Sequence, residues 1–319
     1  MKKILIVGAG GQIGSELTSH LRKIYGASNV VASDIRRTPG ITDDGPFEVL
    51  DVLEAQRLAF LVHKYNIDTI FNLVALLSAT GEKNPIGAWR INMGALMNTL
   101  EVATSFGCSV FTPSSIGAFG PNSPKDKTPQ DTVMRPTTMY GVCKVSGELL
   151  GDYYHQRFGL DTRSVRFPGI ISNVTLPGGG TTDYAVEIFY EAIKNKRFTC
   201  PVPENSYMDM MYMPDALNAC VELMEADTSK LKHRNSFNIA SMSFTPEIIY
   251  KAIKKRMPEF EMTYDIDPVK AAIADSWPNM LDDTCAREEW GWAPKWDLES
   301  MTDDMLKIIG QKYKDGLLK

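Results

Sequence analysis

The sequence predicts an α/β fold, a doubly wound parallel sheet of the Rossmann type with a smaller C-terminal substrate-binding lobe. Two observations support this prediction. Short apolar runs alternate with longer amphipathic segments from the N-terminus to about residue 170, a rhythm that is typical of repeated βα units around a parallel sheet. In addition, the first apolar run leads directly into a glycine-rich turn, as it does in folds that bind dinucleotides.

The N-terminal run over residues 4–7 is Ile-Leu-Ile-Val, which is too short for a helix and indicates a buried parallel strand. Gly8, Gly11 and Gly14 follow it with the spacing GxxGxxG rather than the commoner GxGxxG. Glycine lets the chain turn sharply, lets a pyrophosphate approach the start of the next helix, and lets that helix pack on the strand. We therefore expect a helix to begin near residue 12 and the turn to bind a dinucleotide through Gly8, Gly11, Gln12, Ile13 and Gly14.

The second expected strand ends in a carboxylate. Residues 30–32 are Val-Val-Ala and run into Ser33 and Asp34, at the place where a dinucleotide fold holds the adenosine ribose. An aspartate there accepts hydrogen bonds from both ribose hydroxyls and repels a 2′-phosphate, so Asp34 predicts NAD as the cofactor. Arg36 and Arg37 follow directly, and a basic pair can hold that phosphate, which leaves the degree of preference for NAD over NADP open.

The alternation of strands and helices continues along the chain. We expect strands over residues 69–74, 109–112 and 162–167, and helices over about 54–65, 85–106 and 137–158. In such sheets ligands bind beyond the carboxyl ends of the parallel strands. The residues that we expect to face the cofactor cleft there are Asp51, Val52, Leu73, Ala75 and Ser78.

Beyond about residue 170 the regular alternation ends. A glycine-rich turn over 177–180 precedes a helix expected over 182–195, and further helices are expected over about 214–226, 245–256 and 299–312. We expect an NAD-binding domain over residues 1–170 and a substrate-binding lobe mainly over 171–319. No change of composition marks a linker between them, so the boundary is soft and the chain can cross back.

The composition excludes several classes of partner. With 319 residues, 44% of them hydrophobic and 23% charged, the chain has the composition of an ordinary globular protein. Its net charge of −5 and its scattered Lys and Arg residues argue against a nucleic-acid-binding surface. No apolar run reaches the about 18 residues of a transmembrane helix, and the N-terminal run is of strand length and is not a signal peptide. We therefore expect a cytoplasmic protein with neither a nucleic-acid nor a membrane partner.

The cysteines and histidines give no sign of a metal site. The five cysteines and four histidines contain no CxxC motif and no spacing typical of metal ligands. Reduced, mostly buried thiols in a cytoplasmic protein are the expected state. The sequence therefore predicts an enzyme without a metal ion and argues against a zinc-dependent one.

Tyr140 and Lys144 are four residues apart in a segment expected to be helical, so their side chains share one face. A lysine cation and a positively charged nicotinamide ring both favour the phenolate form of a tyrosine. Such a phenolate accepts the hydroxyl proton of a secondary alcohol while hydride leaves the same carbon. A YxxxK pattern alone is more often a solvated helix face, but here it is combined with the glycine-rich turn and with Ser114 and Ser115 after the strand 109–112. The combination indicates a catalytic site.

Together these residues resemble the extended short-chain dehydrogenase/reductase superfamily over nearly the whole chain. The matching residues are Gly8, Gly11, Gly14, Asp34, Asp51, Val52, Asn92, Ser115, Tyr140, Lys144 and the segment 291–294. The resemblance implies that Ser115 hydrogen-bonds the substrate oxygen, that Tyr140 is the acid/base, and that Lys144 binds the nicotinamide ribose of NAD. It also implies a homodimer that pairs through the long helices, here about 89–106 and 137–157.

Two positions depart from the sugar-nucleotide members of this superfamily. Residue 168 is Pro where many members have Asn, and residue 208 is Met where they have an Arg that clamps the diphosphate. The segments 75–80, 113–120, 166–170 and 178–185 instead resemble the zinc-independent L-threonine 3-dehydrogenases. That resemblance implies NAD-dependent oxidation of L-threonine to L-2-amino-3-oxobutanoate, in threonine catabolism towards glycine or aminoacetone. The residues that it implies around the substrate are Ser78, Ser114, Ser115, Tyr140, Thr182 and Asp183.

Three interpretations stay open from the sequence. The first is the L-threonine 3-dehydrogenase. The second is a sugar-nucleotide epimerase or dehydratase that retains its NAD, against which Pro168 and Met208 argue. The third is a non-catalytic dinucleotide-binding regulator, against which the intact Ser115, Tyr140 and Lys144 argue.

Asp183 itself has two interpretations. By resemblance it is the one obvious carboxylate for the ammonium group of the substrate. The structural alternative is that Thr182 and Asp183 only cap the helix that follows, since both residue types are good N-caps.

Overall fold

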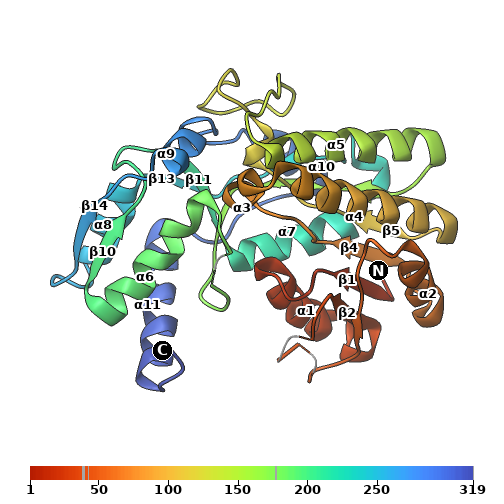
Figure 1. Cartoon of the computed structure of the whole chain (residues 1–319), viewed down its shortest axis with the longest axis horizontal. Helices are drawn as coiled ribbons and strands as arrows, with labels where there is room; N and C mark the ends of the chain where they lie inside the picture. The colour runs from red at the N-terminus through yellow and green to blue at the C-terminus, as the bar shows by residue number, and fades with distance from the viewer. Residues whose placement is uncertain (38–39, 42, 177, 319) are drawn as a thin grey trace.

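The centre of the molecule is a parallel β-sheet. The structure is a computed structural model that describes residues 1–37, 40–41, 43–176 and 178–318. The first residue of the glycine-rich turn predicted over 177–180 therefore lies outside the described part. Six strands pair in parallel in the order β3-β2-β1-β4-β5-β7 (Figure 1). This order, which extends from β1 in both directions, is that of a doubly wound fold, and the predicted fold class is confirmed. The strands are β1 Ile4–Val7, β2 Val30–Asp34, β3 Phe47–Val49, β4 Thr69–Asn72, β5 Ser109–Phe111 and β7 Thr162–Arg163.

Helices cover both faces of this sheet (Figure 1). Successive side chains of a strand point to opposite faces, and accordingly Ile4 and Ile6 of β1 belong to one apolar core while Leu5 and Val7 belong to another. Helices α1 and α7 line the first core, and α2, α4 and α5 line the second. Their bounds are α1 Gln12–Tyr25, α2 Ala55–Tyr65, α4 Pro85–Phe106, α5 Met139–Phe158 and α7 Met213–Glu225.

The two long helices begin and end where local chemistry dictates. Helix α4 has the bounds that the sequence predicts, because Pro85 follows the N-cap Asn84 and Gly107 ends the helix with a φ of 71°. Helix α5 begins two residues later than predicted, since Thr138 is its N-cap and accepts a hydrogen bond from the Gly141 N–H. Both helices therefore present their first turns to the carboxyl edge of the sheet, where a ligand is expected.

The strand predicted over residues 162–167 is divided at Ser164. Its first half, β7, is the edge of the central sheet, while its second half, β8, belongs to a separate three-stranded sheet. The Ser164 N–H donates to the Arg234 carbonyl and the Ser164 carbonyl accepts from the Phe237 N–H, so the backbone changes partners at this residue. The prediction of one continuous strand was wrong because apolar periodicity reports extended backbone and not its pairing partner. The second sheet consists of β6 Ser114–Ser115, β8 Val165–Phe167 and β12 Phe237–Asn238.

The C-terminal half forms a smaller lobe around its own apolar core and also returns to the central sheet. The lobe core is built on α6, α8, α11 and on the sheet β13-β11-β9, whereas α7 packs on α1 (Figure 1). The lobe elements are β9 Gly169–Ile171, α6 Tyr184–Asn195, β10 Arg197–Cys200, β11 Met208–Tyr212, β13 Met242–Phe244, α8 Pro246–Lys254, β14 Glu261–Tyr264, α9 Pro268–Asp275 and α11 Leu298–Lys314. The remaining short helices are α3 Ser78–Lys83, α10 Thr284–Trp290 and the 3₁₀ turns η1 Ala27–Asn29, η2 Ile116–Ala118, η3 Thr181–Asp183 and η4 Thr228–Lys230.

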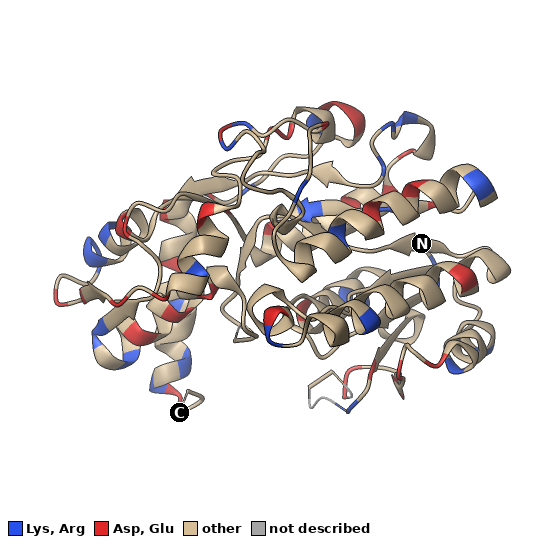
Figure 2. Ribbon diagram, turned by 45° about the horizontal axis from the view of Figure 1, so that its top comes forward, with Lys and Arg blue, Asp and Glu red and all other residues tan. Residues whose placement is uncertain are grey.

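Charged residues are distributed over the outer helices and loops with both signs interspersed (Figure 2). Among the described helices, none combines the length and the apolar character that a membrane crossing needs. The described surface therefore has no large region of a single charge sign.

Candidate active site

The glycine-rich turn joins β1 to α1 with very little space. Gly8 has a φ of +86°, and a Cβ atom built on Gly14 would lie 2.2 Å from the Gly8 carbonyl oxygen. A side chain at position 14 would therefore push α1 off the turn, whereas at Gly11 the nearest atom to a Cβ is an ordinary 3.4 Å away. Glycine is thus favoured at the three positions for different reasons. Gly8 adopts a positive φ, Gly14 lets α1 pack on the turn, and Gly11 leaves space for a ligand to approach.

The residues at the start of α1 fit a dinucleotide diphosphate. The N-cap Gly11 has no side chain to accept a hydrogen bond, and within the described chain the backbone N–H groups of Gln12, Ile13 and Gly14 have no acceptor. The Gln12 side-chain amide nitrogen is also buried without a partner. A helix N-terminus with free N–H groups attracts a phosphate, so this turn has the donors that the predicted cofactor needs.

Asp34 lies at the end of β2, beside the glycine-rich turn. Its carboxylate accepts hydrogen bonds from the N–H groups of Gly10 at 2.8 Å and Ile35 at 2.7 Å. Arg36 and Arg37 are exposed beyond it. Asp34 is thus held at the position from which a carboxylate reaches a ribose, and its contact with NAD stays a prediction, as does that of the nearby Asp51 and Val52.

One cavity of ≈ 150 Å³ brings most of the remaining predicted residues together. It lies between the start of α1, the carboxyl ends of β4, β6 and β8, the start of α5, and the turn before α6. The predicted residues on its wall are Gln12, Ile13, Leu73, Ala75, Ser78, Ser114, Ser115, Tyr140, Lys144, Thr182 and Asp183. Gly8, Gly11, Gly14, Asp34, Asp51 and Val52 lie outside this wall, around the ends of β1, β2 and β3.

Tyr140 and Lys144 face the cavity from the first turns of α5. The Lys144 Nζ atom is 5.3 Å from the centre of the Tyr140 ring and donates a hydrogen bond of 2.5 Å to the Pro113 carbonyl. The Tyr140 residue is 9% exposed. The ammonium group is therefore fixed near the phenol, which is the arrangement that the YxxxK spacing predicts.

Ser115 reaches the same cavity from β6. Its Oγ atom accepts a hydrogen bond of 3.1 Å from the Gly117 N–H, which leaves the hydroxyl proton available to another acceptor. A Cβ atom at Gly117 would lie only 3.0 Å from the Tyr140 ring and 3.5 Å from the Ser115 hydroxyl. The glycine at position 117 is thus what allows the two catalytic candidates to approach each other.

Ser114 is engaged in a buried ion-pair network. Its hydroxyl donates to a Glu148 carboxylate oxygen, and Glu148 accepts two hydrogen bonds from the Arg166 guanidinium, at 3.0 and 2.8 Å. The Arg166 and Glu148 side chains are 5% and 4% exposed. This network joins α5 to β8, and the predicted contact of Ser114 with substrate stays a prediction.

Asp183 folds back onto the glycine-rich turn before it. One oxygen of its carboxylate accepts hydrogen bonds from the N–H groups of Gly179 at 2.9 Å and Gly180 at 2.8 Å. Burial is the largest cause of the raised pKa of this carboxyl group. No side-chain hydrogen bond caps α6 itself, but Asp183 is the third residue of η3, which leads into α6, and its carboxylate accepts from the N–H of Gly180, the N-cap of that turn. The capping alternative therefore holds for η3. Its second oxygen has no hydrogen bond within the described residues, and binding of a substrate ammonium there stays a prediction.

Sequence reasoning gave no role to three residues of this site, of which it named only Asn92, by resemblance. Trp277 lines the cavity from the segment after α9, and Gly117 has no side chain to come between Ser115 and the Tyr140 ring. Asn92 holds the loop after β4 through hydrogen bonds to the Leu76 N–H and carbonyl. Asn92 and Gly117 lie in segments that resemble the family, so the sequence indicated the segments but not the function of these two residues. Trp277 lies in no motif, because only the tertiary fold brings it to the cavity.

Comparisons with known proteins identify the family of the chain. The profile of the NAD dependent epimerase/dehydratase family matches residues 4–240. An uncharacterized epimerase/dehydratase of Staphylococcus aureus (strain MRSA252) is 55% identical over 314 residues, which are 98% of each chain. The solved structure of L-threonine dehydrogenase from Clostridium difficile is 58% identical, with a TM-score of 0.96 over 98% of each chain. The holo form of the GalE-like L-threonine dehydrogenase from Cupriavidus necator is 50% identical, with a TM-score of 0.93 over 96% of this chain and 99% of that one. The chain therefore belongs to the NAD-dependent epimerase/dehydratase family of extended short-chain dehydrogenases/reductases, an enzyme family that uses NAD(P).

Proposed function

We propose that the chain is an NAD-dependent L-threonine 3-dehydrogenase. The observation that carries this proposal is the cavity in which Ser115, Tyr140 and Lys144 face Thr182 and Asp183, next to the free N–H groups at the start of α1. The sequence identity to the two solved L-threonine dehydrogenases supports the same activity. The reaction is L-threonine + NAD⁺ → L-2-amino-3-oxobutanoate + NADH + H⁺.

Tyr140, Ser115 and Lys144 have different roles in the proposed reaction. Tyr140 accepts the proton of the C3 hydroxyl, and Ser115 donates a hydrogen bond to the same oxygen and orients it. Lys144 stabilises the phenolate electrostatically and binds the ribose of the cofactor. Bound NAD⁺ supplies the acceptor for the hydride that leaves C3. The enclosed position of Tyr140 keeps bulk water away from the proton transfer.

The two charged ends of L-threonine have partners on the cavity wall. The Asp183 oxygen that makes no hydrogen bond to the turn accepts from the substrate ammonium. The hydroxyl groups of Thr182 and Ser78 donate to the carboxylate of the substrate. Trp277 and Ile116 supply apolar surface for the methyl group. These contacts favour a small amino acid over a sugar nucleotide.

Two further positions argue against a sugar-nucleotide epimerase or dehydratase. Met208 is fully buried in the lobe core, so it offers no cation to a diphosphate. Pro168 lines the cavity where an Asn would offer hydrogen bonds. The alternative activity would thus lack both polar groups that its substrate requires.

One assay separates these functions. Purified protein is incubated with NAD⁺ and L-threonine and NADH absorbance is followed, while a parallel sample receives UDP-glucose and is analysed for UDP-galactose. We expect NADH formation with threonine, its loss in Tyr140→Phe, and no sugar epimerisation. Epimerisation without threonine oxidation would refute the proposal, and neither activity in a protein that binds NAD⁺ would favour the regulator.

We further propose a cytoplasmic homodimer that pairs through α4 and α5, with residues 1–170 binding NAD and most of 171–319 binding substrate. Ile86 on α4 is 76% exposed and Leu149 on α5 is 62% exposed, although both are apolar, and the two helices lie side by side. All five cysteines are free thiols, which fits a reducing compartment. Light scattering after size exclusion tests the dimer, and Leu149→Asp should shift it towards monomer.

A further inference from the structure

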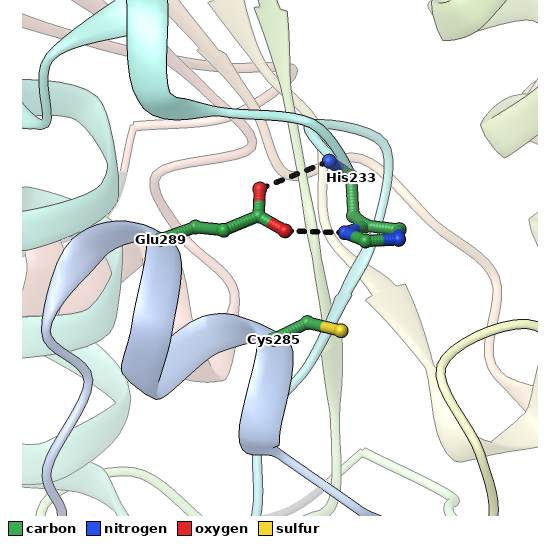
Figure 3. Close-up of side chains that lie close together, drawn as sticks. All are labelled: His233, Cys285 and Glu289. Atoms are coloured by element: carbon green, nitrogen blue, oxygen red, sulfur yellow. Dashed lines mark hydrogen bonds and ion pairs between the residues drawn. The ribbon is translucent and has the colours of Figure 1, made fainter.

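Three side chains far from the candidate active site form a compact cluster of potential metal ligands. The cluster consists of His233, Cys285 and Glu289, and one ligand atom from each lies within 4.8 Å of the other two (Figure 3). Cys285 and Glu289 project from consecutive turns of α10, and His233 approaches from the segment between η4 and β12. His233 and Glu289 are 56 residues apart in the chain, which explains why ligand spacing in the sequence gave no sign of this cluster.

The Glu289 carboxylate is fixed in place and turned inward. One of its oxygens accepts hydrogen bonds from the backbone N–H groups of Lys232 and His233, at 2.5 and 3.2 Å. Its other oxygen shares a short hydrogen bond with the His233 Nδ1 atom (Figure 3). The Glu289 side chain is 9% exposed and that of His233 is 27% exposed. The two ligands are therefore preorganised, and ordering them costs little when an ion binds.

The surroundings of the cluster are rich in negative charge. Over the described part of the chain, no Lys or Arg side chain pairs with Glu289. Asp131 lies 3.5 Å from the His233 Nε2 atom through an 86% exposed carboxylate. Four carboxylates lie near enough for their charges to act on the Cys285 thiol, those of Glu289, Asp131, Asp282 and Glu288. The imidazole of His233 is the partner of the Glu289 carboxylate and neutralises its charge only when it is protonated. A bound cation would neutralise that charge in place of the proton.

We propose that His233, Cys285 and Glu289 bind a divalent transition-metal ion of the zinc type. An imidazole nitrogen, a thiolate and a carboxylate are the ligand set of Zn²⁺ and Co²⁺, whereas Ca²⁺ and Mg²⁺ take oxygen ligands. Ligand atoms at about 2.0–2.3 Å from a tetrahedral ion lie roughly 3.3–3.8 Å apart. To reach this spacing the His233 and Glu289 ligand atoms must move apart, with the ion replacing the proton between them. A water completes the four ligands, because Asp131 lies at the Nε2 atom of His233, on the other side of the imidazole ring.

The position of the site defines its role. None of the three ligands lines the cavity of Tyr140 and Ser115, so the ion would not take part in the proposed oxidation. It would instead clamp α10 to the segment before β12, and β12 pairs with β8, which leads into the cavity wall. The expected effect is on stability rather than on turnover.

Cobalt is the probe for the test. Protein treated with a chelator is titrated with Co²⁺, and we expect one equivalent to give a thiolate-to-cobalt charge-transfer band that Zn²⁺ abolishes by displacement. Cys285→Ser and His233→Gln should lose the band. His63→Gln, an exposed histidine on α2, and Glu288→Gln are the matched controls and should keep it. Zn²⁺ at a hundredfold excess over its dissociation constant should raise the melting temperature of wild type and controls by about 3–5 °C.

A second measurement needs no variant. The other four cysteines are buried, so iodoacetamide should modify Cys285 first, and Zn²⁺ should slow that modification at least tenfold as read by peptide mass spectrometry. Absence of a cobalt band in wild type, a band that survives Cys285→Ser, or alkylation that Zn²⁺ does not slow would each overturn the proposal. Threonine oxidation should stay within about twofold of wild type in His233→Gln, so failure of the metal site and failure of the proposed function are separate results.

Discussion

Exchange of Gly11 or Gly14 for alanine should affect two different properties, although both glycines belong to one motif. At Gly14 the added Cβ would meet the Gly8 carbonyl oxygen at 2.2 Å, the Ala9 Cα at 2.9 Å and the Ala9 carbonyl carbon at 3.1 Å. All three are backbone atoms and no rotamer relieves the overlap. Since Cβ atoms do not approach within 3.0 Å of such atoms, α1 must move off the turn by roughly 0.8 Å or more.

Two opposing contributions to the free energy of unfolding decide whether Gly14→Ala stabilises or destabilises the protein. Alanine inside a helix is favoured over glycine by about 1 kcal/mol, whereas overpacking against rigid backbone costs about 1–3 kcal/mol or more. We expect Gly14→Ala to lower the melting temperature by several degrees. The moved N–H groups also lose the diphosphate, and two charge-assisted hydrogen bonds lost at about 1.5 kcal/mol each weaken NAD⁺ binding by about two orders of magnitude.

Gly11→Ala is the matched comparison. Its backbone at φ −75° and ψ 174° suits alanine, and its nearest neighbour is 3.4 Å away, so the melting temperature should stay within about 1 °C. The methyl group would nevertheless stand where the diphosphate approaches, and NAD⁺ affinity should fall. Calorimetric titration with NAD⁺ and scanning calorimetry of both variants measure these effects. Unchanged stability of Gly14→Ala would refute the packing argument, and unchanged NAD⁺ affinity of Gly11→Ala would refute the assignment of this turn to the diphosphate.

Four further substitutions test the site. Tyr140→Phe removes the proton acceptor and little volume, so turnover should fall by at least about 10²-fold while calorimetric NAD⁺ affinity persists; near-normal turnover would contradict the acid/base role. Asp34→Ala should relax the preference for NAD⁺ over NADP⁺ in kcat/KM, and a wild-type enzyme that already prefers NADP⁺ would show that the neighbouring arginines dominate. Asp183→Asn keeps an oxygen for the turn N–H groups but loses the charge, so the KM for threonine should rise with little change in melting temperature; unaltered kinetics would leave Asp183 a structural residue only. Glu148→Ala leaves the buried Arg166 cation unpaired, which should cost about 3–5 kcal/mol in urea denaturation; a loss below about 1 kcal/mol would mean that water compensates the cation.

Features with a local cause were predictable from the sequence. The bounds of α4 follow from Asn84, Pro85 and Gly107, and the position of Asp34 follows from an apolar strand that ends beside a glycine-rich turn. The shared face of Tyr140 and Lys144 follows from helical periodicity alone. In each case the signal lies within a few residues, where backbone chemistry decides the conformation.

Features with a tertiary cause were not predictable in this way. The break at Ser164 depends on a partner strand about seventy residues later, and Trp277 reaches the cavity only because the chain after α9 returns there. Nothing in the local sequence distinguishes Ser114 from Ser115, yet in the structure the Ser114 hydroxyl donates to the buried Glu148 carboxylate. The cluster of His233, Cys285 and Glu289 likewise assembles from two segments whose separation resembles no ligand motif.

The change of sheets at Ser164 has a consequence for how such enzymes diversify. Up to that residue, the chain has supplied the glycine-rich turn after β1 and the three catalytic candidates. The turn follows a strand of the central sheet, Tyr140 and Lys144 lie on α5, and Ser115 lies on β6 of the second sheet. Thr182, Asp183 and Trp277, which line the same cavity, come later in the chain, from the part that forms the lobe. If the proposed function holds, changes confined to these later segments would alter substrate choice and leave the residues proposed for hydride transfer in place.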